Sequence, residues 1–171
     1  TALLAAVTLT TGAGRAAAQD DAPSAPAPPA VLAAEGRCGK CHPSERVQFE
    51  RSRHAQEDIG CVACHGGDPG ALTVEGAHSR GFTGRLSKPA ILKMCGSCHS
   101  DEKRMQPYNL PVDQYALYQL SGHGVRLAKG DLRVAVCSDC HGAHDILSVS
   151  DARSLSYPLN VARTCGKCHG D

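Results

Sequence analysis

One five-residue motif dominates this chain: two cysteines separated by two residues and followed directly by a histidine. It occurs five times in 171 residues and uses all ten cysteines. Residues 35–171, which carry the copies, provide fewer than 30 residues for each. Any fold of this chain must therefore be built around what the motifs bind. The copies are Cys38-Gly-Lys-Cys41-His42, Cys61-Val-Ala-Cys64-His65, Cys95-Gly-Ser-Cys98-His99, Cys137-Ser-Asp-Cys140-His141 and Cys165-Gly-Lys-Cys168-His169.

The motif Cys-x-x-Cys-His is the attachment site of c-type haem. Its two thiols form thioether bonds to the porphyrin edge, and the adjacent histidine reaches the iron as an axial ligand. The sequence therefore predicts five covalently bound haem c groups. The ten cysteines are the predicted attachment points, and the five motif histidines are the predicted proximal ligands.

Other uses of Cys-x-x-Cys fit less well. A zinc ribbon needs paired cysteines but no histidine directly after each pair. Histidine is only 9 of 171 residues, so five chance placements have a probability on the order of 10⁻⁶ or less. A disulfide framework does not impose one spacing five times, and a thioredoxin-type motif occurs once, beside a βαβ pattern.

The chain lacks the side chains for an ordinary core. It has no Trp, and Phe49 and Phe82 are its only phenylalanines. A small domain of this kind buries too little apolar surface to be stable on side chains alone. The predicted fold is therefore mostly irregular with short α-helices, with a stack of haems forming the core. The apoprotein is expected to be largely unfolded.

The N-terminal residues predict export. Residues 1–18 are small and apolar, and Ala16-Ala17-Ala18 precede Gln19 in the manner of a cleavage site. We interpret them as the end of a secretory signal whose charged start is missing; the alternative is an ordinary Ala-rich helix. Because bacteria attach c-type haem outside the cytoplasm, the predicted location is the periplasm or another extracytoplasmic space.

The next segment, residues 19–34, is rich in Pro and Ala and predicts a spacer. No later stretch has the roughly 18 apolar residues needed to span a bilayer. Removing Arg15 with the signal leaves 17 of the 18 basic residues against 17 acidic ones. Haem propionates would make the loaded protein acidic, and no basic stripe indicates nucleic-acid binding.

The predicted haem domain, residues 35–171, contains an internal repeat. Units at about 38–78 and 95–144 each hold two motifs and two further histidines, and an incomplete unit begins at Cys165. Glycine follows the second motif of each complete unit. We therefore expect the chain to be a fragment that ends inside a repeat.

Four histidines lie outside the motifs, two in each complete unit. Bis-histidine ligation of the four corresponding haems is the simplest interpretation, but the sequence does not assign each histidine to an iron. His144 lies three residues after His141, so it must reach a different haem or follow a sharp turn. The fifth haem has no spare histidine, and Met94 and Met105 are expected to pack rather than to ligate. The predicted distal ligands are His54, His78, His123 and His144.

Proline, glycine and asparagine mark the expected helices. Pro43 is expected to start a helix that reaches about His54. A second helix is expected from Pro89 to Met94, entering the third motif. A third, Pro111–Leu120, is expected to be closed by Gly122. Asn160 is expected to cap a fourth over residues 161–164.

These motifs resemble the multihaem c-type cytochromes with doubled Cys-x-x-Cys-His motifs, often described as cytochrome c3-like. The resemblance covers residues 37–171 and is carried by Ser121-Gly-His-Gly124, Cys140-His-Gly-Ala-His-Asp-Ile146, Tyr157-Pro-Leu-Asn160, Thr164-Cys-Gly-Lys-Cys-His169 and the run from Met105 to Gln114. It implies extracytoplasmic electron transfer, with motif histidines proximal and Ser-x-His histidines distal.

Two functions of different class follow. The first is an electron carrier in a respiratory chain, with mostly bis-His haems and with redox partner proteins or a membrane quinol-oxidising subunit as partners. The second is a multihaem oxidoreductase of the nitrite or hydroxylamine type, which needs an iron with an open axial position. The sequence places that position at the fifth haem.

Overall fold

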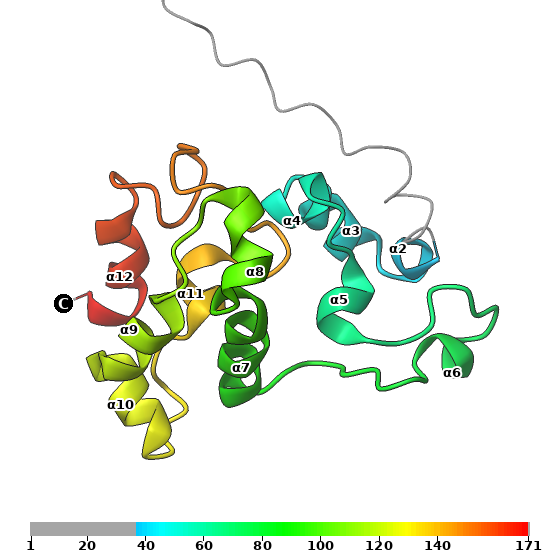
Figure 1. Cartoon of the computed structure of the whole chain (residues 1–171), viewed down its shortest axis with the longest axis horizontal. Helices are drawn as coiled ribbons and strands as arrows, with labels where there is room; N and C mark the ends of the chain where they lie inside the picture. Colours follow the sequence, from blue (N-terminus) through cyan, green and yellow to red (C-terminus); the bar gives the residue numbers. More distant parts are fainter. Residues whose placement is uncertain (1–36, 171) are drawn as a thin grey trace, which may run out of the picture.

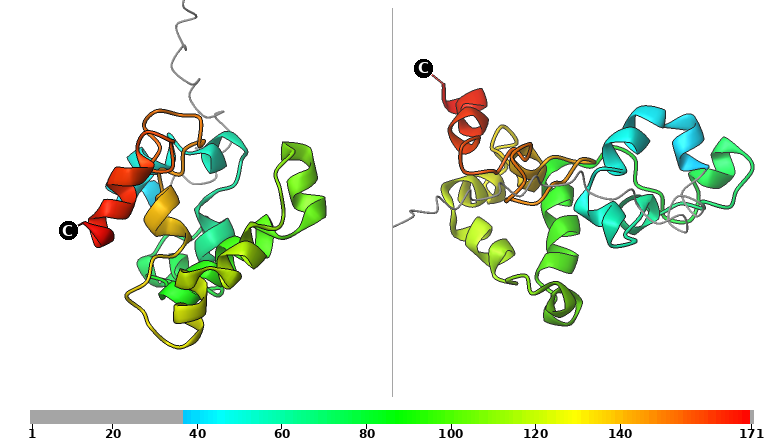
Figure 2. Two further views of the ribbon diagram at one scale, coloured as in Figure 1. Left: turned by 90° about the vertical axis from the view of Figure 1, so that its left-hand side faces the viewer. Right: turned by 90° about the horizontal axis from the view of Figure 1, so that it is seen from above.

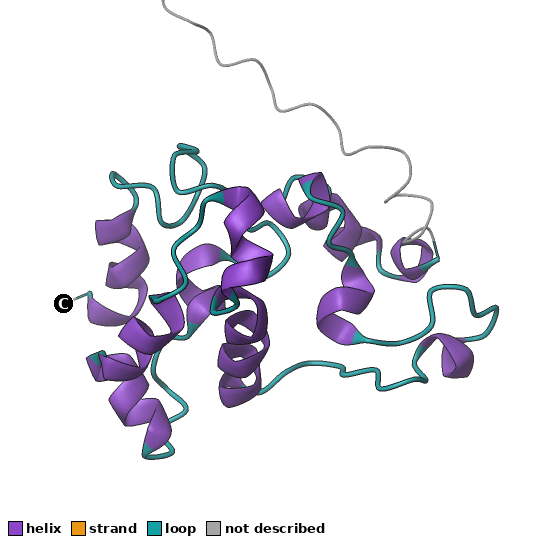
Figure 3. Cartoon of the chain, viewed as in Figure 1, coloured by secondary structure: helices purple, strands orange, loops and turns teal. Residues whose placement is uncertain are grey.

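The computed structural model describes residues 37–170, so the expected signal and spacer lie outside the described residues. Within this range the chain forms short helices, loops and turns and no strand (Figure 3). The expected mostly irregular fold with short α-helices is thus confirmed. The elements are α2 Cys38–Cys41, α3 Pro43–Phe49, α4 Arg53–Gln56, α5 Cys61–His65, α6 Val74–Ala77, α7 Lys88–His99, α8 Glu102–Met105, η1 Gln106–Tyr108, α9 Gln114–Leu120, α10 Gly122–Ala128, α11 Cys137–His141 and α12 Val161–His169.

The elements are spread along one long axis. Helices α2, α3, α5 and α6 lie at one end, and α9, α10 and α12 lie at the other, with α7 and α11 between them (Figure 1). The view from above shows the same two ends (Figure 2, right). The five motif-bearing helices therefore follow one another along the molecule in chain order.

None of the described helices has both the length and the apolar character needed to cross a bilayer.

Few apolar side chains are buried among the described residues, and three of them form one cluster. Leu127, Val134 and Val136 form the main cluster, and Ile91, Leu92 and Tyr118 pack against it. This cluster joins α7 and α10 to the segment that enters α11. Met105 is also buried, at 5% exposure, but several large side chains are exposed; the exposed fractions are 86% for Leu72, 80% for Leu120 and 83% for Leu159. Side chains alone leave much apolar surface for bound groups to cover.

The helix expected from Pro43 to about His54 is divided in two, and the one expected over Pro111–Leu120 forms as α9 but begins at Gln114. The helix that begins at Pro43 ends at Phe49, and α4 starts separately after Ser52. The hydroxyl oxygen of Ser52 accepts the Ala55 N–H at 3.1 Å. In the same way Ser121 accepts the Gly124 N–H at 3.1 Å, so the segment after it opens α10 instead of closing a helix. A serine N-cap thus begins the helix that carries His54 and the one that carries His123.

The other two expected helices are confirmed but extend further. Helix α7 begins with Pro89 in its first turn and runs through the third motif to His99. Helix α12 runs through the fifth motif. Asn160 occupies the N-cap position of α12, but its side-chain amide donates to the carbonyl oxygens of Ala152 and Ser154. It therefore fixes the preceding loop rather than capping the helix.

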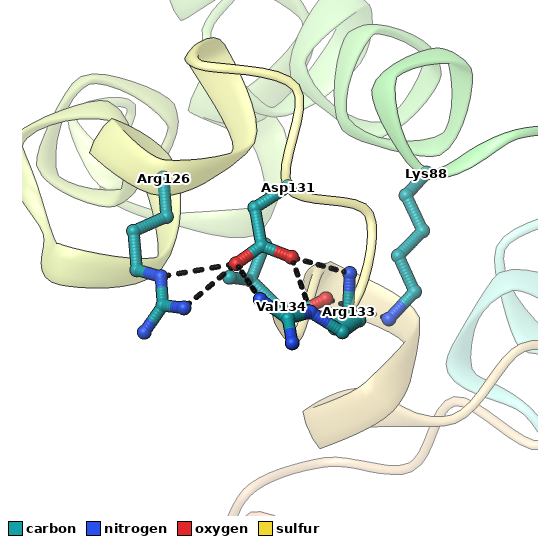
Figure 4. Close-up of polar contacts among 5 residues, drawn as sticks. All are labelled: Lys88, Arg126, Asp131, Arg133 and Val134. Carbon is teal, nitrogen blue, oxygen red and sulfur yellow. Dashed lines mark hydrogen bonds and ion pairs between the residues drawn. The ribbon is translucent and has the colours of Figure 1, made fainter.

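A cluster of charged groups fixes the loop that leads into α11 (Figure 4). The carboxylate of Asp131 binds the guanidinium groups of Arg126 at 2.7 Å and Arg133 at 2.9 Å. Hydrogen bonds from Arg133 hold the pKa of Asp131 well below its usual range. From α7, the Lys88 ammonium donates to the Val134 carbonyl at 2.6 Å. These contacts hold the fourth motif against α7.

Candidate haem sites

Helical geometry explains the spacing of the motif. In an α-helix, residues three and four positions apart lie on the same face. The two cysteines and the histidine of a motif occupy positions i, i+3 and i+4, so one helix turn presents all three together. Helices α5 and α11 each coincide with a motif, and α7 and α12 end with one. In the first motif α2 ends at Cys41, and His42 follows it directly.

The structure brings each histidine outside the motifs against one motif histidine. The ring centres of these pairs are 5.9 to 6.2 Å apart, and each pair joins a different motif to a different distal candidate. The pairs are His42 with His78 at 6.2 Å, His54 with His99 at 6.1 Å, His65 with His144 at 6.2 Å, and His123 with His169 at 5.9 Å.

This separation fits an iron between two imidazoles. A metal–imidazole nitrogen bond is about 2 Å long. Two such bonds in line, with about 1 Å from each nitrogen to its ring centre, separate the ring centres by about 6 Å. Two imidazoles that pack directly have no need of such a gap. The four pairs therefore have room for the iron of a haem, with the adjacent cysteines available for its attachment.

The pairing resolves which histidines face each other, a question that the sequence left open. Only the His42–His78 pair lies within one repeat unit; the other three cross between units. His144 lies beside His65, so it reaches a different motif from the one it follows. The Arg53 N–H donates to the Ile146 carbonyl at 2.8 Å, which holds the segment after His144 against the start of α4.

One expectation from the sequence is wrong. The fifth motif is not the one without a facing histidine, because His123 lies beside His169. The sequence left open which motif His123 would face. Helices α10 and α12 lie at the same end of the molecule (Figure 1). Among the described residues, which include all nine histidines, His141 has no ring at this distance.

Two motif histidines are held through their Nδ1 atoms. The Nδ1–H of His65 donates to the Thr83 carbonyl at 3.0 Å. The Nδ1 of His141 lies 3.3 Å from the Ser156 hydroxyl. Such contacts fix the ring and leave Nε2 available for a metal. Neither Thr83 nor Ser156 carries a sequence signal for this role, since each comes from a loop distant from its histidine.

Burial favours the ligating form of three histidines. Desolvation lowers the pKa of His54, His99 and His141 below the ordinary value. The nearby His99 ring lowers the pKa values of His54 and His141 further. A metal binds the neutral imidazole, so these surroundings suit ligands.

Neighbouring motifs lie close enough for their thiols to interact. A hydrogen bond with Cys137 raises the pKa of Cys95, and the same bond lowers the pKa of Cys137 to about 7. Burial raises the pKa of Cys140, and Cys165 of the fifth motif adds to the rise. The third motif thus adjoins the fourth, and the fourth adjoins the fifth. In a haem-loaded chain these sulfurs would be thioethers and would not titrate.

At the other end of the row, an aromatic ring links the first two sites. Phe82 lies 4.3 Å from His78, which faces the first motif, and 6.5 Å from His65 of the second, measured between ring centres. His42 and His144 also share a neighbour, because both lower the pKa of Glu45, after the larger effect of its hydrogen bond with Ser44. Contacts therefore connect the first site to the second.

The glycine after the second motif of each complete unit has a steric reason. Gly66 and Gly142 have φ values of 64° and 85°, which favour glycine. A Cβ at Gly66 would lie 2.6 Å from the Gly81 carbonyl oxygen, and one at Gly142 would lie 2.7 Å from a carboxylate oxygen of Asp145. The repeated glycine therefore allows the chain to turn tightly after the motif.

The comparison with known proteins agrees with the motifs. The chain is similar to the multihaem cytochrome MtrA of Shewanella baltica (strain OS185), with 27% identity over 135 residues. The chain is a distant relative of a multihaem cytochrome. The match covers 78% of this chain and 31% of the relative, so the chain spans less than a third of that cytochrome's length. No family model and no solved structure matches the chain.

This relationship supports a c-type cytochrome with several haems that takes part in electron transport. It does not extend to the cytochrome c3-like group, which stays a prediction from the motifs. The number of haems and their ligands rest on the residues described above.

Proposed function

We propose that this chain is an extracytoplasmic electron carrier that holds five haem c groups, four of them between two of its own histidines. The observation that supports this most strongly is the set of four histidine pairs at 5.9 to 6.2 Å. Each pair contains one motif histidine and one of the predicted distal histidines. A chain without haem would have no reason to hold four such pairs at the same spacing.

The proposed ligands follow from the pairs. The ten motif cysteines form the thioether bonds, and the five motif histidines are the proximal ligands. His78 completes the first site, His144 the second, His54 the third and His123 the fifth. Two histidines fill both axial positions of an iron and leave no position for a substrate, which favours a carrier over an enzyme. Because axial methionine raises the potential of a haem, bis-His sites are expected to have low potentials.

The arrangement also suits transport along the molecule. The motifs follow each other along the long axis (Figure 1), and the thiols of the third, fourth and fifth interact. Electrons would therefore pass from one haem to the next between two ends. Residues 35–171 act as one pentahaem domain in this proposal, because three of the four pairs join different repeat units.

The setting of the carrier follows from its chemistry. Haem c is attached outside the bacterial cytoplasm, so we place the protein in the periplasm or another extracytoplasmic space, after export by a signal peptide. Its partners would be other redox proteins or a membrane subunit that oxidises quinol, in a respiratory chain. The nitrite- or hydroxylamine-type oxidoreductase loses the place that the sequence assigned to it, since His123 lies beside His169.

The decisive experiment counts haems and ligands in protein produced with cytochrome c maturation. Pyridine haemochrome and intact mass should give five covalent haems per chain. Replacing His78 with Ala should convert one low-spin haem to a high-spin one in EPR, because it removes one axial ligand. The control Tyr108→Ala, at a half-exposed aromatic residue outside the pairs, should leave the spectrum unchanged. Free thiols with bound zinc would contradict the proposal.

A further inference from the structure

We infer that Ser156 lowers the reduction potential of the fourth haem by accepting a hydrogen bond from the proximal histidine, His141. The two residues are 15 positions apart in the chain, and the Ser156 hydroxyl oxygen lies 3.3 Å from the Nδ1 atom of His141. Ser156 acts through the ring of His141, so it is a positioning residue. This inference rests on the proposed five-haem function.

Iron binding fixes which of the two atoms is the donor. A neutral histidine that binds iron through Nε2 keeps its proton on Nδ1. The Nδ1–H of His141 must therefore donate, and the Ser156 oxygen must accept. The O–H of Ser156 is then free to donate to the Ser154 hydroxyl oxygen, 3.1 Å away. Ser154 also accepts the Ser156 N–H, at 3.3 Å. The hydrogen bonds thus run in one direction, from the histidine to Ser156 and on to Ser154.

The loop that carries the two serines is anchored to the helix of the fifth motif. Ser154 is buried, at 2% exposure. Its carbonyl oxygen accepts the side-chain amide of Asn160 at 2.8 Å, and the Leu155 carbonyl accepts the Thr164 hydroxyl at 2.7 Å. Thr164 belongs to α12, which carries the fifth motif. These contacts hold the backbone on both sides of Ser156 and so fix the place of its hydroxyl.

The direction of the hydrogen bond gives the direction of its effect. An imidazole that donates from its second nitrogen is a more basic ligand, which stabilises Fe(III) relative to Fe(II) and lowers the one-electron potential. The electron comes from a neighbouring haem, or from dithionite in a titration, and His141 keeps its Nδ1 proton in both states. In the second site the acceptor is the Thr83 main-chain carbonyl, 3.0 Å from Nδ1 of His65. The fourth site uses a side chain, which a substitution can remove.

A second Ser-x-Ser turn in the same loop provides a matched control. The hydroxyl oxygens of Ser148 and Ser150 lie 2.8 Å apart, and the Ser150 N–H donates to the Ser148 oxygen at 3.3 Å. This is the geometry of the turn at Ser156. Within the part of the chain that the structure describes, neither of these two hydroxyls is hydrogen-bonded to a motif histidine. Ser150→Ala therefore removes an equivalent hydroxyl without changing the contact with the fourth motif.

The test is a redox titration of the holoprotein with dithionite, followed by visible absorption. In Ser156→Ala one of the five one-electron steps should move to higher potential, by more than any of the other four. Ser156→Thr, which keeps a hydroxyl, and Ser150→Ala should both match the wild type. Ser154→Ala should give a smaller shift in the same direction, because it removes the acceptor that polarises the Ser156 hydroxyl.

A further variant assigns the shifted step to the fourth haem. In C137S/C140S, which cannot attach that haem, adding Ser156→Ala should leave the remaining four steps unchanged. If C137S/C140S does not fold, the contrast between Ser156→Ala and Ser156→Thr decides. An unchanged or lowered potential in Ser156→Ala, an equal shift in Ser156→Thr, or a shift that persists in C137S/C140S would overturn the inference and leave the proposed carrier intact. A haem count other than five in the wild type would instead contradict the proposed function.

Discussion

The two ends of this molecule are stabilised differently. The part from α7 onward contains the apolar cluster of Leu127, Val134 and Val136 and the charged cluster around Asp131. In residues 37–82 the buried side chains are Ser52, at 0% exposure, and Ala55, at 1%. We call residues 37–82 the first region and the part from α7 onward the second region. The first region thus has fewer buried apolar side chains than the second. We therefore expect bound haem to contribute more to the fold of residues 37–82 than to that of the part from α7 onward.

The regions also exchange ligands. His54 of the first region faces His99 on α7, and His144 of the second region faces His65 on α5. Two of the proposed haem sites therefore lie between the regions, and an iron at either site would connect them. The first region would be held both by its own haems and by these two connections.

The largest effect is expected when haem attachment is prevented. Chain produced without cytochrome c maturation, and kept reduced, should lose amide protection throughout residues 37–82. Residues 88–136 should retain weak protection, because the cluster around Leu127 can form without haem. Hydrogen exchange measured by mass spectrometry on both forms checks this. Equal protection in the two regions of the unloaded chain would show that the difference between them is not intrinsic.

The apolar cluster gives the next effect. Leu127 is 6% exposed, and replacing a buried Leu with Ala lowers the free energy of unfolding by about 2 to 5 kcal/mol. We expect about 2 kcal/mol for Leu127→Ala, since the cluster is small and can partly collapse. The control Val47→Ala in the first region, 59% exposed, should change it by less than about 0.5 kcal/mol. Denaturant unfolding of the holoproteins followed by circular dichroism measures both.

The sequence groups the candidate site residues but does not give their arrangement in space. Motif spacing selects the ten cysteines and five of the histidines as candidates, because that spacing places them together on one helix turn. The repeat identified His54, His78, His123 and His144 as a set. It could not give their pairing, since a pair such as His54 with His99 depends on how distant helices pack. The same limit misplaced the unpaired motif histidine at His169 instead of His141.

The helix starts show the other limit. Ser52 and Ser121 belonged to a recognised Ser-x-His repeat, yet their capping role was not predicted. The helix signal at Pro43 suggested one helix to about His54, and Gly122 was expected to close a helix, whereas each serine begins a new helix through its own hydroxyl. Side-chain caps override such weak local preferences.

The two serine caps permit a matched comparison. Ser52→Ala should lower the free energy of unfolding by about 1 to 2 kcal/mol, because it leaves the buried Ala55 N–H without an acceptor. Ser121→Ala should have a smaller effect, about 1 kcal/mol, since Ser121 is only half-buried. Ser→Thr at either position should largely restore stability, as Thr also caps. A larger effect at Ser121 would show that burial of the cap does not determine the size of the effect.

The smallest effect concerns charge. Two Asp-x-Arg turns of the second region share a geometry, in which the aspartate accepts the N–H and the guanidinium of the arginine two residues later. Hydrogen bonds from Arg133 lower the pKa of Asp131, and those from Arg153 lower the pKa of Asp151 to about 2. A carboxyl whose pKa is lower in the folded state stabilises the fold above its unfolded pKa, about 3.9. That stabilisation is lost as the pH falls through the unfolded and then the folded pKa.

Asp131→Asn should therefore lower the thermal unfolding midpoint of the holoprotein slightly at pH 7, and the difference from the wild type should shrink between about pH 4 and pH 2. The matched change in the first region is Asp68→Asn, which removes the ion pair with Arg80 at 3.3 Å and leaves an oxygen to accept the Gly70 N–H. We expect a smaller shift there, because Arg80 is 76% exposed and solvent screens such pairs. Calorimetry of the wild type and both variants, at pH 7 and again at the acid end of this range, measures the shifts. If Asp68→Asn has the larger effect at pH 7, the charged cluster of the second region does not contribute to the difference between the two ends.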